Sequence, residues 1–160
     1  MFFWIFCKKN NVSFYELIQF LLKPKVNTIA KNFIKTIDEH ETFEVEFNTI
    51  KQKLYWPKEF SIARLDQVIA ETFDTKDWHF YQKEHTVIEN GEILLDIGTA
   101  EGLFPLTVID QCDYVYMIEP SKLFSNCLDK TFNAFSDKVT IYNTAVGNFD
   151  GTISFNEDSL

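Results

Sequence analysis

The positions of apolar residues in the first part of the chain predict three helices. Ser13 and Glu16 are spaced as a capping box, in which each side chain satisfies a free backbone N–H group, so a helix is expected over residues 14–22. Apolar residues recur at helical spacing over residues 27–39 and again over residues 61–73. The third helix begins with a serine suited to capping.

Between the last two of these helices the pattern changes to that of β-strands. Residues 43–47 alternate apolar and acidic side chains, as a strand with one face in water does. A second strand over residues 50–56 would complete a hairpin, although its turn contains no glycine. Residues 1–60 are therefore assigned to an N-terminal extension of helices and a hairpin. One or two irregular helical turns are expected between residues 78 and 91.

Beyond residue 91, short apolar segments alternate with helical ones. Strands are expected over residues 92–98, 114–119, 138–143 and 152–155, and helices over residues 103–110 and 121–135. This alternation predicts a parallel sheet with right-handed crossovers. Residues 61–160 are therefore expected to form an α/β, Rossmann-like domain.

The composition is that of a folded protein without a basic surface. Hydrophobic residues make up 46% of the 160 residues, and 17 residues are Phe, enough to fill a core. The net charge of −9 argues against nucleic acid as a substrate. Cys7, Cys112 and Cys127 are too far apart for a zinc pattern, so no metal site is expected. Nothing requires an oxidising compartment, and the apolar residues 1–7 are too few to span a membrane, so a cytoplasmic location is expected.

The most informative segment is the turn after the first strand of the predicted parallel sheet, Asp96-Ile97-Gly98-Thr99-Ala100-Glu101-Gly102. Gly98 would let the chain turn sharply and let a ligand approach the backbone. Gly102 would allow close packing at the start of the next helix, whose first N–H groups favour a carboxylate or a phosphate. The turn is therefore the expected ligand site.

Asp96 distinguishes between two ligands of this kind of turn. Dinucleotide-binding turns have two glycines two residues apart beside the pyrophosphate, whereas Ala100 takes the second of those positions here. A carboxylate at the end of the strand would repel a pyrophosphate and attract the ammonium group of an amino-acid ligand, directly or through water. The sequence therefore favours S-adenosylmethionine over NAD.

The ends of the next two strands complete the predicted cofactor site. Glu119 lies where a carboxylate commonly accepts both hydroxyls of a ribose, and Asn143 and Ala145 would border the adenine. His79 and Tyr81, upstream of the first of these strands, are further candidates to approach the cofactor.

Residues 78–155 resemble the FkbM family of S-adenosylmethionine-dependent methyltransferases. Residues 94–104 are similar to its first motif, residues 116–120 to its Glu-Pro second motif, and residues 145–151 to the segment after its third strand. Three such segments in order make the resemblance specific over about half of the chain. Thr99 departs from the small residue often found at its position in the family.

The resemblance implies a class I methyltransferase fold and transfer of a methyl group, typically to a hydroxyl oxygen of a sugar or other small metabolite. By the same resemblance, Asp96, Gly98, Ala100 and Gly102 would hold the methionine part of the cofactor, and Glu119 would bind the ribose. Thr99, within the same turn, is also expected to be a cofactor-binding residue. The family's acceptor loops follow later strands. The chain is therefore expected to be a truncated form, inactive alone, and no catalytic residue is assigned.

Two other functions remain open at this stage. A degenerate methyltransferase fold could act as a non-catalytic module in protein contacts, and a nucleotide-dependent oxidoreductase is disfavoured by Asp96 and Ala100. The edge of the strand at residues 93–97 is expected to be apolar and unpaired, which invites association. A partner chain, a second copy or a missing C-terminal half of the domain is expected to cover it, with residues 48–56 as a further alternative. The acceptor itself would be a small molecule or glycan.

Overall fold

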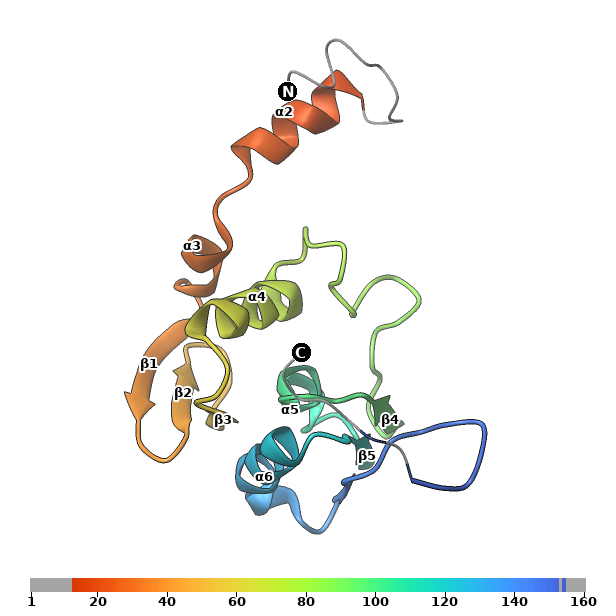
Figure 1. Ribbon diagram of the computed structural model, residues 1–160. Coiled ribbons are helices and arrows are strands. Elements are labelled where there is room, and N and C mark those ends of the chain that lie inside the picture. The colour runs from red at the N-terminus through yellow and green to blue at the C-terminus, as the bar shows by residue number, and fades with distance from the viewer. Residues whose placement is uncertain (1–12, 153, 155–160) are drawn as a thin grey trace.

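The computed structural model describes residues 13–152 and residue 154, which form a mixed α/β fold with two separate three-stranded sheets (Figure 1). One sheet is antiparallel with the order β1-β2-β3, and the other is parallel with the order β4-β5-β6. In chain order the elements are α2 (Phe14–Leu22), α3 (Val26–Ala30), β1 (Ile34–Glu39), β2 (Phe43–Phe47), β3 (Leu54–Trp56), α4 (Ile62–Phe73), β4 (Ile93–Ile97), α5 (Leu103–Val108), β5 (Tyr114–Ile118), α6 (Lys122–Thr131), the 3-10 helix η1 (Asn133–Phe135) and β6 (Val139–Tyr142).

The parallel sheet confirms the strand and helix pattern expected after residue 91. Helix α5 is two residues shorter than predicted, and α6 ends at Thr131 and is followed by η1. Tyr116 at the centre of β5 pairs with Leu95 on one side and Thr140 on the other. Of the predicted fourth strand, residues 153 and 155 lie outside the described residues, and no strand includes Thr152 or Ser154.

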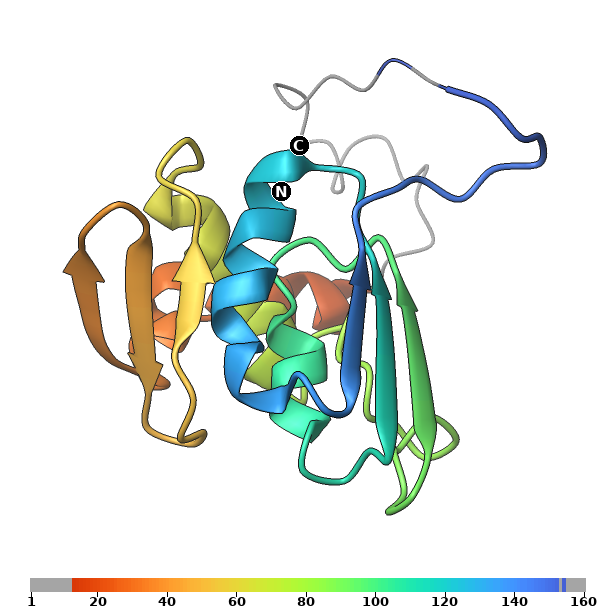
Figure 2. The same ribbon diagram turned by 90° about the horizontal axis from the view of Figure 1, so that it is seen from below.

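All helices that contact the parallel sheet cover one of its two faces. Figure 2 shows α6 between the two sheets, and α6 contacts both β3 and β6. The other face is uncovered among the described residues, and Ile93, Leu95 and Ile97 of β4 are 66%, 58% and 55% exposed. β4 is also an edge strand of this sheet. The expectation that residues 48–56 cover its free edge is wrong, because β3 pairs with β2 in the other sheet.

The antiparallel sheet confirms that the two predicted strands pair as a hairpin, but β3 begins at Leu54 and not at residue 50, and the sheet has one further strand. β2 pairs with β3 so that Phe43 lies opposite Trp56, and β1 pairs along the other side of β2. The helix predicted over residues 27–39 is wrong, since α3 ends at Ala30 and β1 follows. A register shift between Ile34 and Thr36 explains the error. A bulge adds one residue to the strand and shifts the alternation of its side chains. Ile34 and Ile37 are therefore both half-buried although they are three residues apart, a spacing that is also typical of a helix.

One hydrophobic core extends through both halves of the chain. Buried Val45 and Trp56 of the antiparallel sheet belong to the same cluster as Leu106 of α5 and Leu128 of α6. The Trp56 ring lies edge-on to Phe124 of α6, with ring centroids 5.6 Å apart. The assignment of residues 1–60 and 61–160 to separate regions stays a prediction, but the two regions share this core.

The segment between α4 and β4 contains turns and bends but no helix, so the helical turns expected before Gly91 are wrong. Local hydrogen bonds shape it instead: the Thr86 hydroxyl contacts the carbonyl oxygens of Tyr81 and Lys83. At the other end of the chain, the predicted helix at residues 14–22 is confirmed with its capping box. No helix within the described residues has the length and apolar character needed to cross a bilayer.

Candidate functional site

The turn after β4 is held in a fixed shape by backbone hydrogen bonds. The N–H groups of Gly98 and Thr99 both donate to the carbonyl oxygen of Ile118, at 2.8 and 3.3 Å. The Thr99 hydroxyl donates to the carbonyl oxygen of Asp96 at 3.0 Å. The turn is therefore fastened to the end of β5 before the chain enters α5.

Two glycines of this turn have positive φ angles, and their surroundings give them different roles. Gly98 has φ 75°, and a Cβ atom placed there would meet no atom within 4 Å. Gly102 has φ 76°, and a Cβ atom there would lie 2.5 Å from Leu128 and 2.9 Å from Phe132. Gly98 thus leaves open space beside the backbone, and Gly102 permits α5 to pack closely against α6, as the sequence predicted.

Glu119 links the turn after β4 to the turn after β5. The Ala100 N–H donates to Oε2 of Glu119 at 2.8 Å, and the Ser121 N–H donates to Oε1 at 2.7 Å. Ala100 has φ 48°, a left-handed conformation that is uncommon outside glycine and directs its N–H toward this carboxylate. Glu119 itself is buried. The two carboxylate oxygens of Glu119 therefore fix two backbone turns. The sequence predicted only that Glu119 binds a ribose.

A pocket of about 370 Å³ opens beside this turn. Its walls come from α4, the end of β4, the turn itself, the first residues of α5, and Tyr81. The Tyr81 ring lies against Phe104 of α5, with centroids 4.9 Å apart. Tyr81 therefore lines the same pocket as Asp96, Gly98, Thr99 and Ala100.

Three carboxyl groups line this pocket, those of Glu71, Asp96 and Glu101, and its lining residues within the described chain include no Lys, Arg or His. Burial raises the pKa of Asp96 above its ordinary value, a hydrogen bond with Thr99 opposes the rise, and the charge of Glu119 adds to it. Burial likewise raises the pKa of Glu101 to about 7, against hydrogen bonds from the N–H groups of Glu101 and Leu103 and with repulsion from Asp96 and Glu71. A cation bound in the pocket would stabilise the charged forms of these carboxyl groups.

The residues predicted to border the ribose and the adenine lie outside this pocket. Glu119 and Gly102 do not line the pocket, although Gly102 belongs to the turn and Glu119 is hydrogen-bonded to it at Ala100. Asn143 and Ala145 follow β6 and do not line the pocket either. The Asn143 side-chain amide donates to the carbonyl oxygens of Glu119 and Pro120, at 2.9 and 3.1 Å. Asn143 thus stabilises the turn after β5 from the neighbouring strand end.

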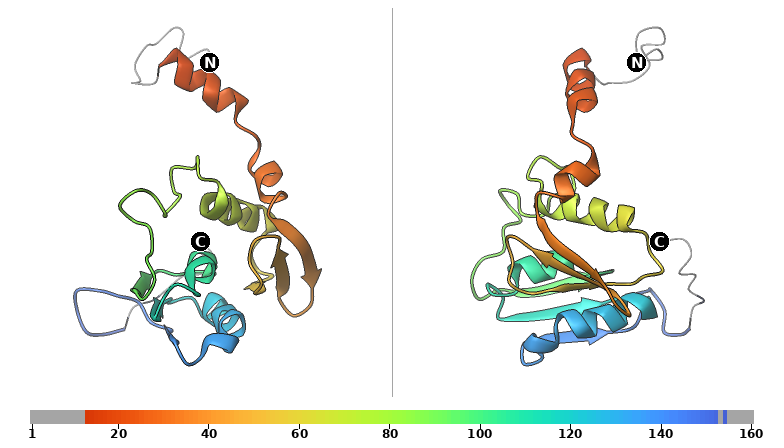
Figure 3. Two further views of the ribbon diagram at one scale, coloured as in Figure 1. Left: turned by 180° about the vertical axis from the view of Figure 1, so that it is seen from behind. Right: turned by 90° about the vertical axis from the view of Figure 1, so that its left-hand side faces the viewer.

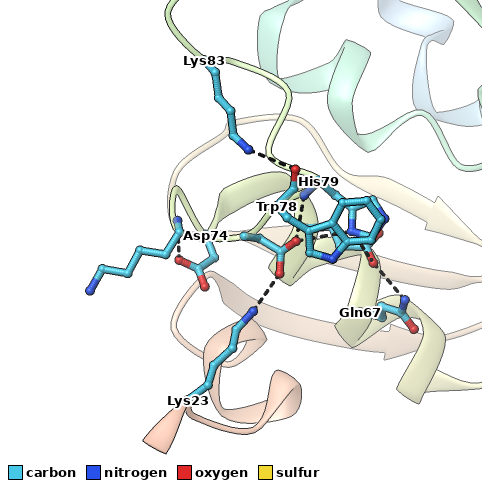
Figure 4. A network of polar contacts seen from close by, with 9 residues as sticks. Lys23, Gln67, Asp74, Trp78, His79 and Lys83 are labelled. Atoms are coloured by element: carbon cyan, nitrogen blue, oxygen red, sulfur yellow. Dashed lines mark hydrogen bonds and ion pairs between the residues drawn. The ribbon is translucent and has the colours of Figure 1, made fainter. Parts of the chain in front are cut away.

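A polar network surrounds His79 (Figure 4), and it includes Glu71, which lines the pocket. The His79 Nδ1 atom is 3.4 Å from Oε1 of Glu71 and 3.3 Å from Oδ1 of Asp77, contacts that have ion-pair distance but lack hydrogen-bond alignment. Gln67 donates to the same oxygen of Glu71 at 2.8 Å. His79 therefore does not line the pocket, but it contacts Glu71, a residue that does.

Glu71 and Glu101 are the site residues that sequence reasoning did not identify. Glu71 comes from α4, 25 positions before Asp96, and only the packing of α4 against α5 brings it to the pocket. Glu101 stood within the predicted motif, but an acid next to a turn glycine is usually a solvent-exposed residue. The sequence carried no signal for its burial, which follows from the positive-φ turn formed by Ala100 and Gly102 in the folded chain.

Comparisons with known proteins give no family assignment. No family model matches the sequence, and no curated protein matches it. Among solved structures, the crystal structure of wild-type Trm5b from Pyrococcus abyssi is similar over 68% of this chain and 34% of that chain, with 14% sequence identity and a TM-score of 0.35. The chain thus spans about a third of that protein.

Proposed function

We propose that this chain binds S-adenosylmethionine at the turn after β4, as the cofactor-binding part of a methyltransferase similar to the FkbM family. The observation that carries the proposal is the pocket at Asp96, which is lined by three carboxyl groups and by no basic side chain within the described residues. S-adenosylmethionine brings an ammonium group and a sulfonium group against a single carboxylate, so its net charge is positive. A dinucleotide would bring a pyrophosphate, which this pocket would repel.

The geometry of the turn supports the same ligand. The open space at Gly98 lets a ligand reach the backbone, and Asp96 and Glu101 would hold the ammonium end of the methionine part. Glu119, Asn143 and Ala145 remain proposed for the ribose and adenine end, with Glu119 also fixing the turns through Ala100 and Ser121. When bound, S-adenosylmethionine supplies an electrophilic methyl group. We propose a hydroxyl of a sugar or another small metabolite as its acceptor, and the cytoplasm as its location.

Calorimetric titration with S-adenosylhomocysteine tests the cofactor assignment. We expect the wild-type chain to bind it and the Asp96→Asn variant to bind it at least about ten-fold more weakly, a loss of about 1.4 kcal/mol. Asp110→Asn is the matched control, because Asp110 is an exposed acid just after α5 and outside the pocket. Thermal unfolding of each variant establishes that the fold is intact.

A non-catalytic module for protein contacts is the second candidate, and the uncovered apolar face of β4 favours it. The same titration separates the candidates. Binding of neither S-adenosylhomocysteine nor NAD would support the module, and binding of NAD alone would support an oxidoreductase. Equal affinity of the wild type and Asp96→Asn for S-adenosylhomocysteine would contradict the proposed role of Asp96.

A further inference from the structure

Helix α2 extends away from the rest of the described chain (Figures 1 and 3). None of its nine residues is buried. Phe20, Leu21 and Leu22 are 75%, 52% and 77% exposed. An apolar helix in this position leaves a surface that water solvates poorly.

The helix is well formed and apolar over most of its circumference. The Glu16 N–H donates to the Ser13 hydroxyl at 3.2 Å, and the Ser13 N–H donates to the Glu16 carboxylate at 2.7 Å, which completes the capping box. Glu16 and Gln19 are the only polar residues of α2, and their three-residue spacing puts them on one strip of the helix. All other faces of α2 present Phe, Tyr, Leu or Ile.

The charge of this part of the chain is opposite to that of the remainder. Residues 1–31 contain five lysines and one acidic residue, a charge of +4, whereas residues 32–160 contain 10 basic and 23 acidic residues, a charge of −13. Lys23 and Lys25 come directly after α2. Lys23 also pairs with Asp77 at 2.9 Å, which ties the base of the helix to the segment after α4 (Figure 4).

We propose that α2 binds the surface of an anionic lipid bilayer, with its apolar side chains in the interface and the exposed Lys25 after the helix at the headgroups. Amphipathic helices with aromatic and leucine side chains bind such surfaces through apolar burial together with attraction of basic residues to anionic lipid. Packing against the α2 of a second copy is a less suitable alternative, because it would bring two positively charged segments together.

Flotation of the full chain with lipid vesicles tests this proposal. We expect the chain to float with phosphatidylcholine vesicles that contain phosphatidylglycerol and not with phosphatidylcholine alone, and to be released by salt that shortens the Debye length below about 10 Å. The double variant Phe20→Ser/Leu21→Ser should reduce the bound fraction at least about ten-fold, because the burial of apolar area drives the insertion. Val146→Ser/Phe149→Ser is the matched control, since it removes two exposed apolar residues from the loop after β6.

Three outcomes would overturn the proposal. They are failure of the wild-type chain to float with the anionic vesicles, equal flotation of the Phe20→Ser/Leu21→Ser variant, and equal flotation with the neutral vesicles. Light scattering without lipid provides the other readout. A dimer that this variant dissociates, together with absence of flotation, would assign α2 to a second copy instead. Unchanged thermal unfolding of both double variants establishes that α2 has been altered without loss of the fold.

Discussion

Gly98 and Gly102 have nearly the same backbone conformation, yet the structure predicts different consequences for replacing them. Both have positive φ, so any side chain at either position costs strain. At Gly102 a Cβ atom would also meet Leu128 and Phe132, whereas at Gly98 it would meet nothing. The difference in stability loss between substitutions at the two positions therefore reports the packing of α5 against α6.

We expect Gly102→Ala to lower the free energy of unfolding by about 2–4 kcal/mol, from backbone strain and overpacking together. Gly98→Ala should lower it by about 1–2 kcal/mol, from strain alone. Urea denaturation followed by circular dichroism measures both. Equal losses in the two variants would contradict the assigned contact between Gly102 and α6.

Glu101 gives the fold a predictable dependence on pH. Its pKa rises from the ordinary 4.5 to about 7 in the folded chain, chiefly through burial. The folded state therefore holds the proton more tightly than the unfolded state. The stabilising contribution of this carboxyl is complete below about pH 4.5 and is lost as the pH rises to about 7.

Replacing Glu101 with Gln should remove this dependence. The difference in unfolding free energy between wild type and Glu101→Gln should shift against the wild type by on the order of 1–3 kcal/mol between these two pH values. Denaturant titrations at a series of pH values provide the measurement. A difference that stays constant with pH would mean that Glu101 is not buried as described.

At the scale of elements, β3 and α6 are joined by a hydrogen bond as well as by apolar packing. The Tyr55 N–H donates to the buried hydroxyl of Thr131 at 3.1 Å. Tyr55 lies on β3, the last strand of the antiparallel sheet, so this N–H has no partner strand on that side among the described residues. The threonine hydroxyl takes the place that a strand carbonyl would have.

Thr131→Val should therefore destabilise the fold by about 1–3 kcal/mol, because it leaves a partly buried N–H group without an acceptor while keeping the shape of the side chain. Thr131→Ser keeps the hydroxyl and serves as its control, with only a methyl group lost. Thermal unfolding of the two variants, compared with wild type, gives the result. A loss of stability in the serine variant as large as that in the valine variant would refute the hydrogen-bond role.

At the scale of the whole molecule, the parallel sheet has one covered and one uncovered face. Helices α5 and α6 lie on one side, and β4 is an edge strand whose outward side chains are exposed isoleucine and leucine (Figure 2). Parallel sheets normally carry helices on both faces. The same strand also borders the proposed cofactor pocket, so association at its outer face would occur close to that site.

We expect the chain to associate as its concentration rises, and Ile93→Lys to weaken that association by placing a charge on the outer face of β4. Val87→Lys is the control, because Val87 is exposed but lies in the irregular segment before β4. Sedimentation velocity over a range of concentrations distinguishes the variants. Association that Ile93→Lys leaves unchanged would locate the contact elsewhere.

The sequence by itself determined most of the elements and the position of the turn proposed to bind the cofactor. Strand and helix periodicity, capping residues and turn glycines act between near neighbours, so the parallel strands, α5, α6 and the place of Asp96 at the end of β4 could be predicted. Periodicity failed at Ile34 and Ile37, because the bulge that allows two residues three positions apart to be half-buried in one strand forms only when β1 pairs with β2.

Only the tertiary structure decided what surrounds that turn. Glu71 reaches the pocket through the packing of α4, and Glu119 accepts hydrogen bonds from Ala100 and Ser121 because two strand ends meet. The raised pKa of Glu101 depends on burial and on charges contributed by Asp96 and Glu71. Burial and electrostatic environment are set by residues distant in the chain, and for that reason the acidic character of the pocket appears only in the folded molecule.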